Sequence, residues 1–340
     1  MSRIYIKVFK ELKFLKTKMN IAILGAGGLG KSAARIIEHK KEVKIVATCD
    51  KRGYIVDEKG IKPKKIYSLN KDDSVAVIGN SSNDTIKEII KAGKLIDGIL
   101  ITLPNLPNKF IPSVAKRFLE NGYEGAFSDP LKRTQAMKIM FGTDKLFKKH
   151  KSSYITGTGA TPGLVTAAAV LASQSFIKVN KVDIFWGVGI DNWEEYKGTI
   201  REDIAHLPGY TIEKAKAMSD GEVEALLDKT NGRLEFRNME HADDILLQKV
   251  GVVDKLSQVT VGGVMDTRHA KKPVTTTMTL TGKTFDGKIS SHKFMLGDET
   301  TMAANVLGPA LGYLKRAIWL RENKIYGVFG STEFMPMVVR

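Results

Sequence analysis

Short apolar runs alternate with amphipathic stretches through the first half of the sequence. The apolar runs predict strands at residues 19–24, 43–48, 74–78, 96–102, 125–128 and 154–157. The stretches between them predict helices at residues 32–39, 84–91 and 107–120, the second preceded by a cap signal at 81–84. Strands that alternate with helices favour a parallel sheet covered on both faces. The predicted fold class of this half is therefore α/β, with a doubly wound sheet.

From residue 178 onward the pattern changes, because strands follow one another with only turns between them. Strands are predicted at 181–189, 256–264, 274–281 and 288–295. Helices are predicted at 164–173, just before this change, and at 211–229 and 300–320, the last interrupted by Gly308-Pro309 and Gly312. Consecutive strands predict an antiparallel or mixed sheet, hence a second, α+β domain. The predicted organisation is an N-terminal extension (1–18), a first domain (19–163), a substrate domain (164–320) and a tail that packs back on the first domain (321–340).

The first strand runs straight into three glycines at G-x-G-x-x-G spacing. Gly25 permits the tight turn, Gly27 lets a pyrophosphate approach the backbone, and Gly30 lets the following helix pack close to the strand. Asp50 ends the second strand about 20 residues later, the place of a ribose-binding carboxylate. This pattern predicts a Rossmann dinucleotide site; the alternative is a Gly-rich turn in another α/β unit. The predicted cofactor-binding residues are Gly25, Ala26, Gly27, Gly28, Leu29, Gly30, Asp50, Lys51, Arg52, Leu103 and Pro104.

The residues after the second strand give two signals about the cofactor. Asp50 would accept hydrogen bonds from ribose hydroxyls, which suggests NAD, whereas Lys51 and Arg52 could hold a 2′-phosphate, which suggests NADP. We therefore expect NAD(P)H in either form to be usable.

Two segments that follow predicted strands carry the candidate chemistry. At 128–133, Asp129 is a good helix N-cap, which would place Lys132 in the first helical turn, where the helix dipole and burial favour a neutral, nucleophilic amine. The alternative is a surface lysine. At 159–163, Thr161 could cap a helix whose free N–H groups bind a substrate carboxylate, or the segment is a tight turn without a ligand. The predicted substrate-binding residues are Ser128, Asp129, Arg133, Gly159, Thr161 and Gly163.

His241 stands among acidic residues that could orient it, and it is a candidate general acid/base; His269 has a similar setting. No histidines pair at metal-ligand spacing, so we predict no metal. Arg201, Arg237 and Arg268 are possible carboxylate anchors that the sequence does not rank.

The composition limits the expected class of protein, its partners and its cellular location. The 340 residues are 43% hydrophobic and 26% charged, which is typical of a globular protein, and no apolar run is long enough to span a bilayer. The net charge of +16 is spread along the chain without aromatic-interleaved basic runs, so we expect no nucleic-acid partner. One cysteine, Cys49, fits a reducing cytoplasm. Residues 1–18 fit an upstream extension with Met19 as initiator, a basic arm or a transit peptide, the first two being favoured. The oligomeric state stays open, a homo-oligomer included.

The glycine turn, the 159–163 turn and the 297–310 segment together resemble the saccharopine-dehydrogenase-like oxidoreductases, over nearly the whole chain after residue 18. Within that group, the 128–133 segment resembles the lysine-bearing segment of the BioU-type (S)-8-amino-7-oxononanoate synthases of biotin biosynthesis. His241 lies at about the distance at which that family keeps an active-site histidine.

The resemblance implies a suicide enzyme that acts on 8-amino-7-oxononanoate with NAD(P)H and CO2. Lys132 would condense with the 7-keto group, and after reduction, carbamate formation and reoxidation its nitrogen would stay on the product. Lys132 would then be the sacrificed amino donor and His241 an acid/base. Two alternatives remain: a multiple-turnover saccharopine- or carboxynorspermidine-like dehydrogenase, and a non-catalytic dinucleotide sensor.

Overall fold

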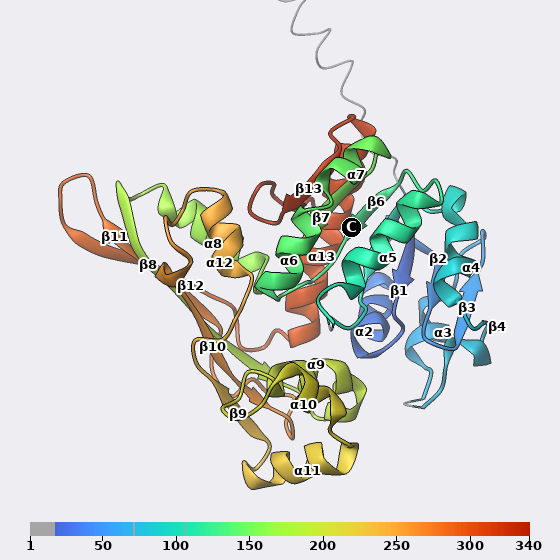
Figure 1. Cartoon of the computed structure of the whole chain (residues 1–340), viewed down its shortest axis with the longest axis horizontal. Coiled ribbons are helices and arrows are strands. Elements are labelled where there is room, and N and C mark those ends of the chain that lie inside the picture. Colours follow the sequence, from blue (N-terminus) through green and yellow to red (C-terminus); the bar gives the residue numbers. More distant parts are fainter. Residues whose placement is uncertain (1–17, 71, 106) are drawn as a thin grey trace, which may run out of the picture.

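The structure, a computed structural model, describes residues 18–70, 72–105 and 107–340 (Figure 1). The predictions for residues 1–17 therefore lie outside the described residues. The first sheet has eight strands in the order β13-β7-β6-β5-β1-β2-β3-β4. They are β1 (Met19–Leu24), β2 (Val43–Cys49), β3 (Gly53–Val56), β4 (Asn80–Ser81), β5 (Gly98–Ile101), β6 (Ala126–Ser128), β7 (Ser153–Thr156) and β13 (Gly327–Gly330).

Strands β13 to β2 pair in parallel, and β3 and β4 are antiparallel additions at one edge. The chain passes from β1 to β2 on one side and later returns to β5 on the other. The carboxyl ends of β1 and β5 therefore flank the switch point at which doubly wound sheets bind ligands. The predicted doubly wound class is confirmed.

Helices cover both faces of the first sheet. One face carries α2 (Gly28–Ile37), α3 (Pro63–Tyr67) and α13 (Met302–Glu322). The other face carries α4 (Thr85–Lys91), α5 (Phe110–Glu120), α6 (Thr134–Phe141) and α7 (Asp144–Lys149). Within β1, Ile21 and Ile23 pack toward the first group, and Ala22 and Leu24 toward the second, because successive side chains of a strand point to opposite faces.

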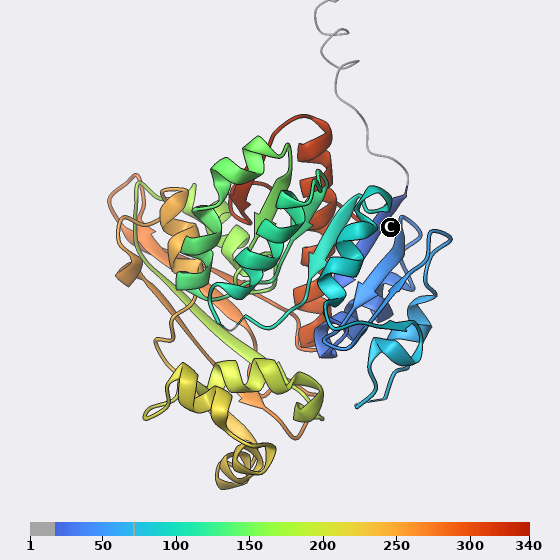
Figure 2. The ribbon, with the colours of Figure 1, turned by 45° about the vertical axis from the view of Figure 1, so that its right-hand side comes forward.

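The second sheet is mixed, as predicted, with the order β12-β11-β8-β10-β9. Its strands are β8 (Lys178–Gly189), β9 (Arg233–Phe236), β10 (Val259–Asp266), β11 (Thr277–Lys283) and β12 (Ile289–Met295). Its inward side chains pack with α8 (Leu164–Ser173), α9 (Lys197–Ile204), α10 (Ile212–Ala217), α11 (Asp220–Lys229) and α12 (Asp243–Lys249). Figure 2 shows α9, α10 and α11 gathered at one end of this sheet. Four short 3-10 helices complete the elements: η1 (Val75–Val77), η2 (Gly93–Leu95), η3 (Trp193–Tyr196) and η4 (Leu256–Gln258).

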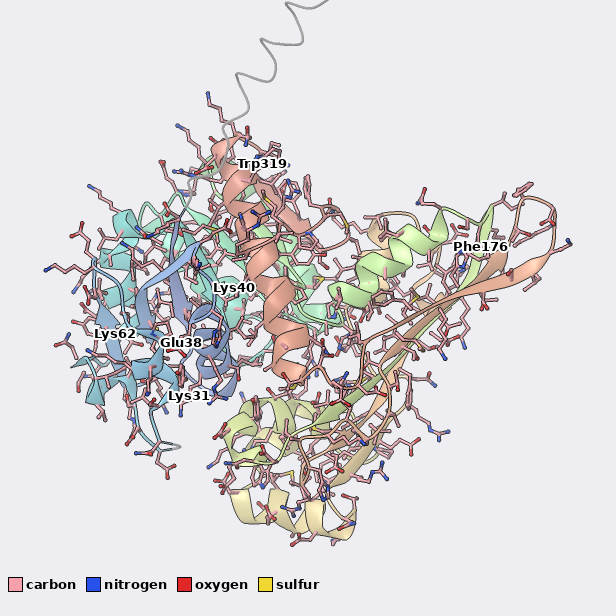
Figure 3. All side chains as sticks on the ribbon, turned by 180° about the vertical axis from the view of Figure 1, so that it is seen from behind. Lys31, Glu38, Lys40, Lys62, Phe176 and Trp319 are labelled. Carbon is pink, nitrogen blue, oxygen red and sulfur yellow. The ribbon has the colours of Figure 1, made fainter. Side chains whose placement is uncertain are left out.

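The C-terminal segment returns to the first sheet. Helix α13 packs on β5, β6 and β7, and β13 pairs with β7. Figure 3 shows α13, which carries Trp319, along the back of the molecule. The structure thus places most of the segment 302–320, which the predicted organisation assigned to the second domain, against the first sheet; the predicted boundaries stay predictions.

Three predicted elements differ from the structure. The strand predicted at 74–78 is wrong: Val75–Val77 form η1, because the Ser74 hydroxyl accepts from the Ala76 amide and Asp50 accepts from the Val75 amide. The helix at 300–320 is not interrupted, since α13 runs continuously with Pro309 inside it. Residues 211–229 form two helices, because Ser219 caps a new helix with its side chain.

The helix start predicted at Asp129 is also wrong. Helix α6 begins at Thr134, and residues 129–133 belong to no helix or strand. The Asp129 carboxylate accepts instead from the Leu131 and Gly157 amides and from the hydroxyls of Tyr154 and Thr156, so no oxygen of Asp129 caps α6. Helix α8 spans the predicted 164–173, but Gly163, not Thr161, is its N-cap.

Candidate active site

The glycine turn has the geometry that a dinucleotide requires. Gly25 has φ +101°, and a Cβ on it would lie 2.8 Å from the carbonyl oxygen of Thr102. A Cβ on Gly30 would lie 1.9 Å from the Gly25 oxygen, so only glycine allows α2 to pack this close to β1. A Cβ on Gly27 would meet nothing within 4 Å, which leaves its backbone open to a pyrophosphate. These residues fit a dinucleotide.

A groove runs from this turn along the end of β2. It is lined by Ala26, Gly27, Gly28, Lys31, Asp50, Lys51, Arg52, Asp73, Glu194 and Glu195. Of the predicted cofactor residues, Leu29 and Leu103 line the adjoining pocket, and Gly25, Gly30 and Pro104 shape the turn without lining either cavity. The nicotinamide end of a dinucleotide is therefore expected in that pocket.

The adjoining pocket holds the predicted catalytic pair, Lys132 and His241. Four further predicted residues line it: Leu29, Leu103, Gly159 and Thr161. Other lining residues are Asn105, Pro130, Ala160, Trp186, Gly187, Val188, Thr199, Asp203, Met239, Met265, Thr276, Leu296, Met302, Asn305 and Val306. Most of the wall is apolar, and Asp203, the one carboxylate among these described residues, contacts Lys132.

Backbone and side-chain hydrogen bonds hold the segment of Lys132 against that of His241. The Ala242 amide donates to the Lys132 carbonyl oxygen at 2.7 Å. The Glu240 carboxylate accepts from the Arg133 guanidinium at 2.5 Å and from the Gln135 amide at 3.0 Å. These bonds explain why two residues 109 positions apart face one pocket.

His241 is part of a buried relay. Its Nδ1 lies 2.6 Å from Oδ2 of Asp243, and both side chains are almost fully buried. Asp243 also accepts from the hydroxyls of Thr161 and Thr166, so the carboxylate is fixed in place. With Nδ1 engaged by the carboxylate, Nε2 is the nitrogen that remains for the pocket. This is the arrangement of an oriented general acid/base.

The amine of Lys132 lies between two carboxyl groups of α9. Its Nζ is 2.6 Å from Asp203 and 3.7 Å from Glu202. Burial by itself would lower the pKa of Lys132, but the charges of Asp203 and Glu202 outweigh it and raise that pKa. The expected neutral amine at a helix start is therefore wrong: no helix begins at Lys132, and the carboxylates favour its ammonium form.

Sequence analysis missed Asp203, Glu202 and Asn105. Glu202 is buried and accepts at 2.9 Å from the Asn105 side chain, and its other oxygen has no hydrogen-bond partner among the described residues. Burial is the main cause that raises the pKa of Glu202. The consecutive acids in α9 were the available signal, but their partner, Lys132, lies about 70 residues away in sequence.

Four predicted substrate residues do not line the pocket: Ser128, Asp129, Arg133 and Gly163. Ser128 hydrogen-bonds Thr158, Arg133 is buried between Glu240 and His206, and Gly163 turns the chain at φ +130°. Asp129 is fully buried within its own four hydrogen bonds. They shape the segments that carry Lys132 and Thr161, and contact with a substrate stays a prediction for them.

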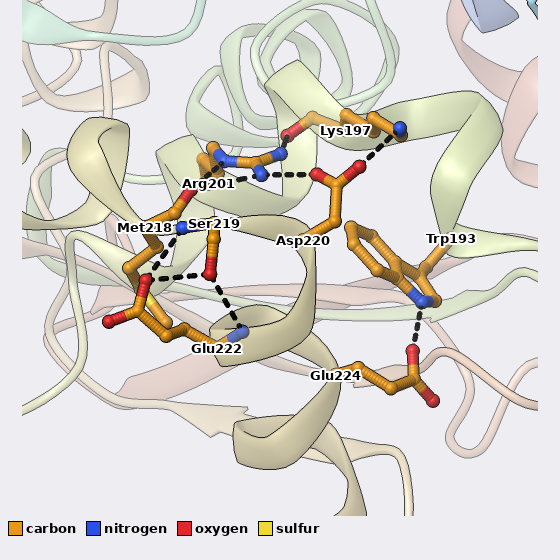
Figure 4. Close-up of polar contacts among 8 residues, drawn as sticks. All are labelled: Trp193, Lys197, Arg201, Met218, Ser219, Asp220, Glu222 and Glu224. Carbon is orange, nitrogen blue, oxygen red and sulfur yellow. Dashed lines mark hydrogen bonds and ion pairs between the residues drawn. The ribbon is translucent and has the colours of Figure 1, made fainter.

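The three arginines proposed as carboxylate anchors are engaged elsewhere. Figure 4 shows Arg201 paired with Asp220, which also pairs with Lys197, at 2.6 and 2.5 Å. Arg268 pairs with two surface carboxylates, and the side chain of Arg237 is 81% exposed. None of the three lines the pocket.

No group of three or more His, Cys, Asp or Glu residues that could hold a metal ion occurs in the described ranges. Within the same residues, none of the helices combines the length and the apolar character needed to cross a membrane. The cytoplasmic location stays a prediction.

Solved structures share this fold. The engineered D-amino acid dehydrogenase bound to NADP+ has a TM-score of 0.57 at 16% identity, over 93% of this chain and 94% of that one. The diaminopimelate dehydrogenase of C. glutamicum in complex with DAP has 0.56 at 15%, over 94% of both chains. The L-Glu-forming saccharopine dehydrogenase of Saccharomyces cerevisiae has 0.52 at 9%, over 92% and 94%.

Sequence comparisons agree. The family profile of Glutamate/Leucine/Phenylalanine/Valine dehydrogenase matches residues 3–105, which contain the glycine turn. The (S)-8-amino-7-oxononanoate synthase BioU of Haloferax mediterranei (strain ATCC 33500) is 41% identical over 350 aligned positions, covering 94% of this chain and 99% of that protein.

The fold, the glycine turn and these relatives define the chain as an NAD(P)-dependent oxidoreductase. More narrowly, the identity to the Haloferax protein over nearly both full lengths shows its family. The chain belongs to the (S)-8-amino-7-oxononanoate synthase BioU family. The resemblance expected from the sequence is thereby confirmed.

Proposed function

We propose that this protein converts 8-amino-7-oxononanoate into the carbamate of 7,8-diaminononanoate in biotin biosynthesis, with Lys132 as a sacrificed amino donor. The observation that carries the proposal is a lysine amine, on a side chain that is only 17% exposed, in the pocket beside the dinucleotide groove. The name of the Haloferax relative contains 8-amino-7-oxononanoate, and the resemblance of the 128–133 segment implies that this compound is the substrate.

Lys132 must first lose a proton, and Asp203, 2.6 Å from Nζ, is placed to take it. The neutral amine attacks the 7-keto carbon and water leaves, which gives an imine. When bound, the nicotinamide supplies reversible hydride transfer. Reduction of the imine leaves a secondary amine between the lysine Cε and the substrate carbon, while the 8-amino group of the substrate takes up CO2.

Loss of a hydride from the lysine Cε, to the nicotinamide oxidised in the first step, would then form a new C=N bond between Nζ and Cε. Hydrolysis then leaves the nitrogen on the product and an aldehyde at Cε, so each protein molecule acts once. His241, oriented by Asp243, is suited to move protons to and from the oxygen that leaves as water or enters from it. The apolar wall, which includes Trp186 and Met265, suits the methylene chain of the substrate.

One observation favours the multiple-turnover dehydrogenase as a second candidate. The ion pair with Asp203 and Glu202 raises the pKa of Lys132. A lysine that stays charged would polarise a carbonyl or bind a carboxylate rather than form an imine.

The mass of the intact protein tests the proposal. After incubation with 8-amino-7-oxononanoate, NADPH and bicarbonate, the chain is expected to be about 1 Da lighter, because an aldehyde replaces the amine of a Schiff-base lysine. Product should stop at one molecule per protein. Lys132→Arg is the matched control, since it keeps a cation near Asp203 but cannot donate its nitrogen in this way, and it should form no product.

Other outcomes identify the alternatives. An unchanged mass with sustained NADPH consumption would overturn the proposal in favour of the multiple-turnover dehydrogenase. Cofactor binding with no turnover would favour the non-catalytic sensor. Product formation by Lys132→Arg would exclude Lys132 as donor.

A further inference from the structure

The carboxylate of Asp50 is occupied by the protein itself. Its Oδ1 accepts from the Arg52 amide at 2.8 Å, the Gly53 amide at 2.8 Å and the Ser74 hydroxyl at 2.9 Å. Its Oδ2 accepts from the Val75 amide at 2.6 Å. These bonds tie the turn after β2 to the segment that begins η1, so Asp50 fixes the rim of the groove.

This engagement changes what Asp50 can do for a ribose. A carboxylate has about two lone-pair sites on each oxygen. Oδ1 already accepts from three donors and Oδ2 from one, so at most one site, on Oδ2, is left for a ribose hydroxyl. A two-oxygen grip on the 2′- and 3′-hydroxyls, the usual basis of NAD selection at this position, would need some of these bonds to break. The feature that favoured NAD in the sequence is therefore weakened, because at most one oxygen of Asp50 is free for a ribose hydroxyl.

Two cations remain beside the place of the ribose. Lys51 and Arg52 both line the groove and are exposed. Across the described part of the chain, the Lys51 ammonium makes no hydrogen bond or ion pair. Arg52 uses one terminal nitrogen for the Asp72 carbonyl oxygen at 2.8 Å, and its other guanidinium nitrogens stay available. Lys31 (labelled in Figure 3) is committed to the carbonyl oxygens of Leu69 and Asn70.

The carboxylates of the groove do not prevent an anion from binding at the end that carries Lys51 and Arg52. Asp73 accepts from the Asn70 amide, and Asp50 is satisfied by its four donors. Glu194 and Glu195 belong to η3, on the wall that also covers Gly28, whereas Lys51 and Arg52 follow β2. An ammonium and a guanidinium side by side form charge-assisted bonds to phosphate, which a ribose hydroxyl cannot match.

We infer that the groove selects NADP(H) over NAD(H), with Lys51 and Arg52 as ligands of the 2′-phosphate and Asp50 as a positioning residue of the groove rim. The inference rests on the dinucleotide site alone, and it stands or falls independently of the lysine chemistry proposed above.

Equilibrium binding to the full chain, without substrate, tests it. Fluorescence titration of NADPH and NADH should give a dissociation constant at least about tenfold lower for NADPH, or about 1.4 kcal/mol. Competition by 2′,5′-ADP and 5′-AMP, which differ only in the 2′-phosphate, should show the same order. Arg52→Ala and Lys51→Ala should each weaken NADPH and 2′,5′-ADP several-fold and leave NADH nearly unchanged. Lys59→Ala, an exposed lysine outside the groove, is the matched control.

The Asp50→Asn variant distinguishes a positioning role of Asp50 in the groove rim from a role as a ligand of the ribose. A positioning role predicts that both cofactors weaken by a similar factor, because the rim that carries Lys51 and Arg52 loosens. A ribose-ligand role predicts loss of NADH affinity with NADPH retained. Equal or tighter binding of NADH by the unaltered chain, or selective loss of NADH in Asp50→Asn, would overturn the inference. Arg52→Ala and Lys51→Ala variants that both bind NADPH like the unaltered chain would do so as well.

Discussion

At the scale of single residues, the protonation of Lys132 controls any reaction of its amine. The carboxylates of Asp203 and Glu202 hold its pKa above the ordinary lysine value, against the effect of burial. The fraction of neutral amine, and with it the rate of covalent capture of substrate, should therefore still be rising with pH above neutrality.

Replacing Asp203 by Asn should shift the pH profile of covalent capture, so that the rising limb of the rate lies at lower pH. Because one carboxylate charge is removed, the effect of burial is opposed less strongly and the pKa of Lys132 falls. The maximal rate should also drop, by about 10²-fold, because the nearest proton acceptor is gone. Single-turnover NADPH consumption, followed as a function of pH, measures both effects. Glu202→Gln, at 3.7 Å rather than 2.6 Å from the amine, should shift the limb less. An unmoved limb in Asp203→Asn would contradict this account of the ion pair.

Asp243 should matter through the orientation of His241. An amide in its place cannot hold the imidazole in the same way, so we expect Asp243→Asn to slow covalent capture by about 10²-fold. The buried hydrogen bonds from Thr161 and Thr166 are also disturbed, at a cost of about 1–3 kcal/mol in the free energy of unfolding. Thermal melting and single-turnover kinetics separate the two effects. Thr166→Val, which removes one donor to Asp243 but keeps the His–Asp pair and lies outside the pocket lining, should be less stable but nearly as fast. A rate unaffected by Asp243→Asn would exclude the relay.

Some of these site residues could be identified from the sequence, and others could not. Lys132 follows a strand of a doubly wound sheet, and His241 stands among acids, so both could be singled out. Asp203 could not, because nothing local marks α9 as the helix that reaches Lys132. Side chains matched across about 70 residues are set by tertiary packing, which periodicity does not encode.

At the scale of elements, the glycine turn was the most predictable part of the chain. Gly25 and Gly30 have the steric roles that the spacing predicted, since a strand, a tight turn and a helix place severe limits on this backbone, and the pyrophosphate contact of Gly27 stays a prediction. The elements that were predicted wrongly depend on side chains that reach distant backbone. Asp50 converts a predicted strand into η1, and Asp129 leaves α6 uncapped because its partners come from β7 and the turn after it.

Two alanine substitutions in the turn should have opposite consequences. Gly30→Ala places a methyl 1.9 Å from a backbone oxygen, so α2 must shift, and the loss of stability should be about 1–3 kcal/mol or more. Gly27→Ala meets no atom within 4 Å, so the melting temperature should hardly change. Its methyl should nevertheless weaken NADPH binding by about tenfold, because it stands where the pyrophosphate approaches the backbone. Normal cofactor affinity in a folded Gly27→Ala protein would contradict this placement of the pyrophosphate.

At the scale of the whole molecule, the pocket is assembled from both halves of the chain. The first half supplies Leu29, Asn105 and Lys132, and α9 supplies the carboxylates that contact Asn105 and Lys132. The preceding element, η3, packs on the glycine turn: a Cβ on Gly28 would lie 2.6 Å from the Glu195 carbonyl oxygen. One continuous segment, η3 followed by α9, thus contacts the glycine turn at one end and Lys132 at the other.

Gly28→Ala should therefore act on Lys132 from a distance. The added methyl pushes η3 and α9 away, which lengthens the contact between Asp203 and the amine and removes part of the cause that raises the pKa of Lys132. At saturating NADPH, the rising limb of the single-turnover pH profile should shift to lower pH, as in Asp203→Asn. Gly27→Ala is the neighbouring control, because its methyl disturbs the cofactor but not α9, and at saturating cofactor its limb should stay in place. If the two variants gave the same profile, the link between the turn and the lysine through α9 would be excluded, and the effects of both glycines would be confined to the cofactor.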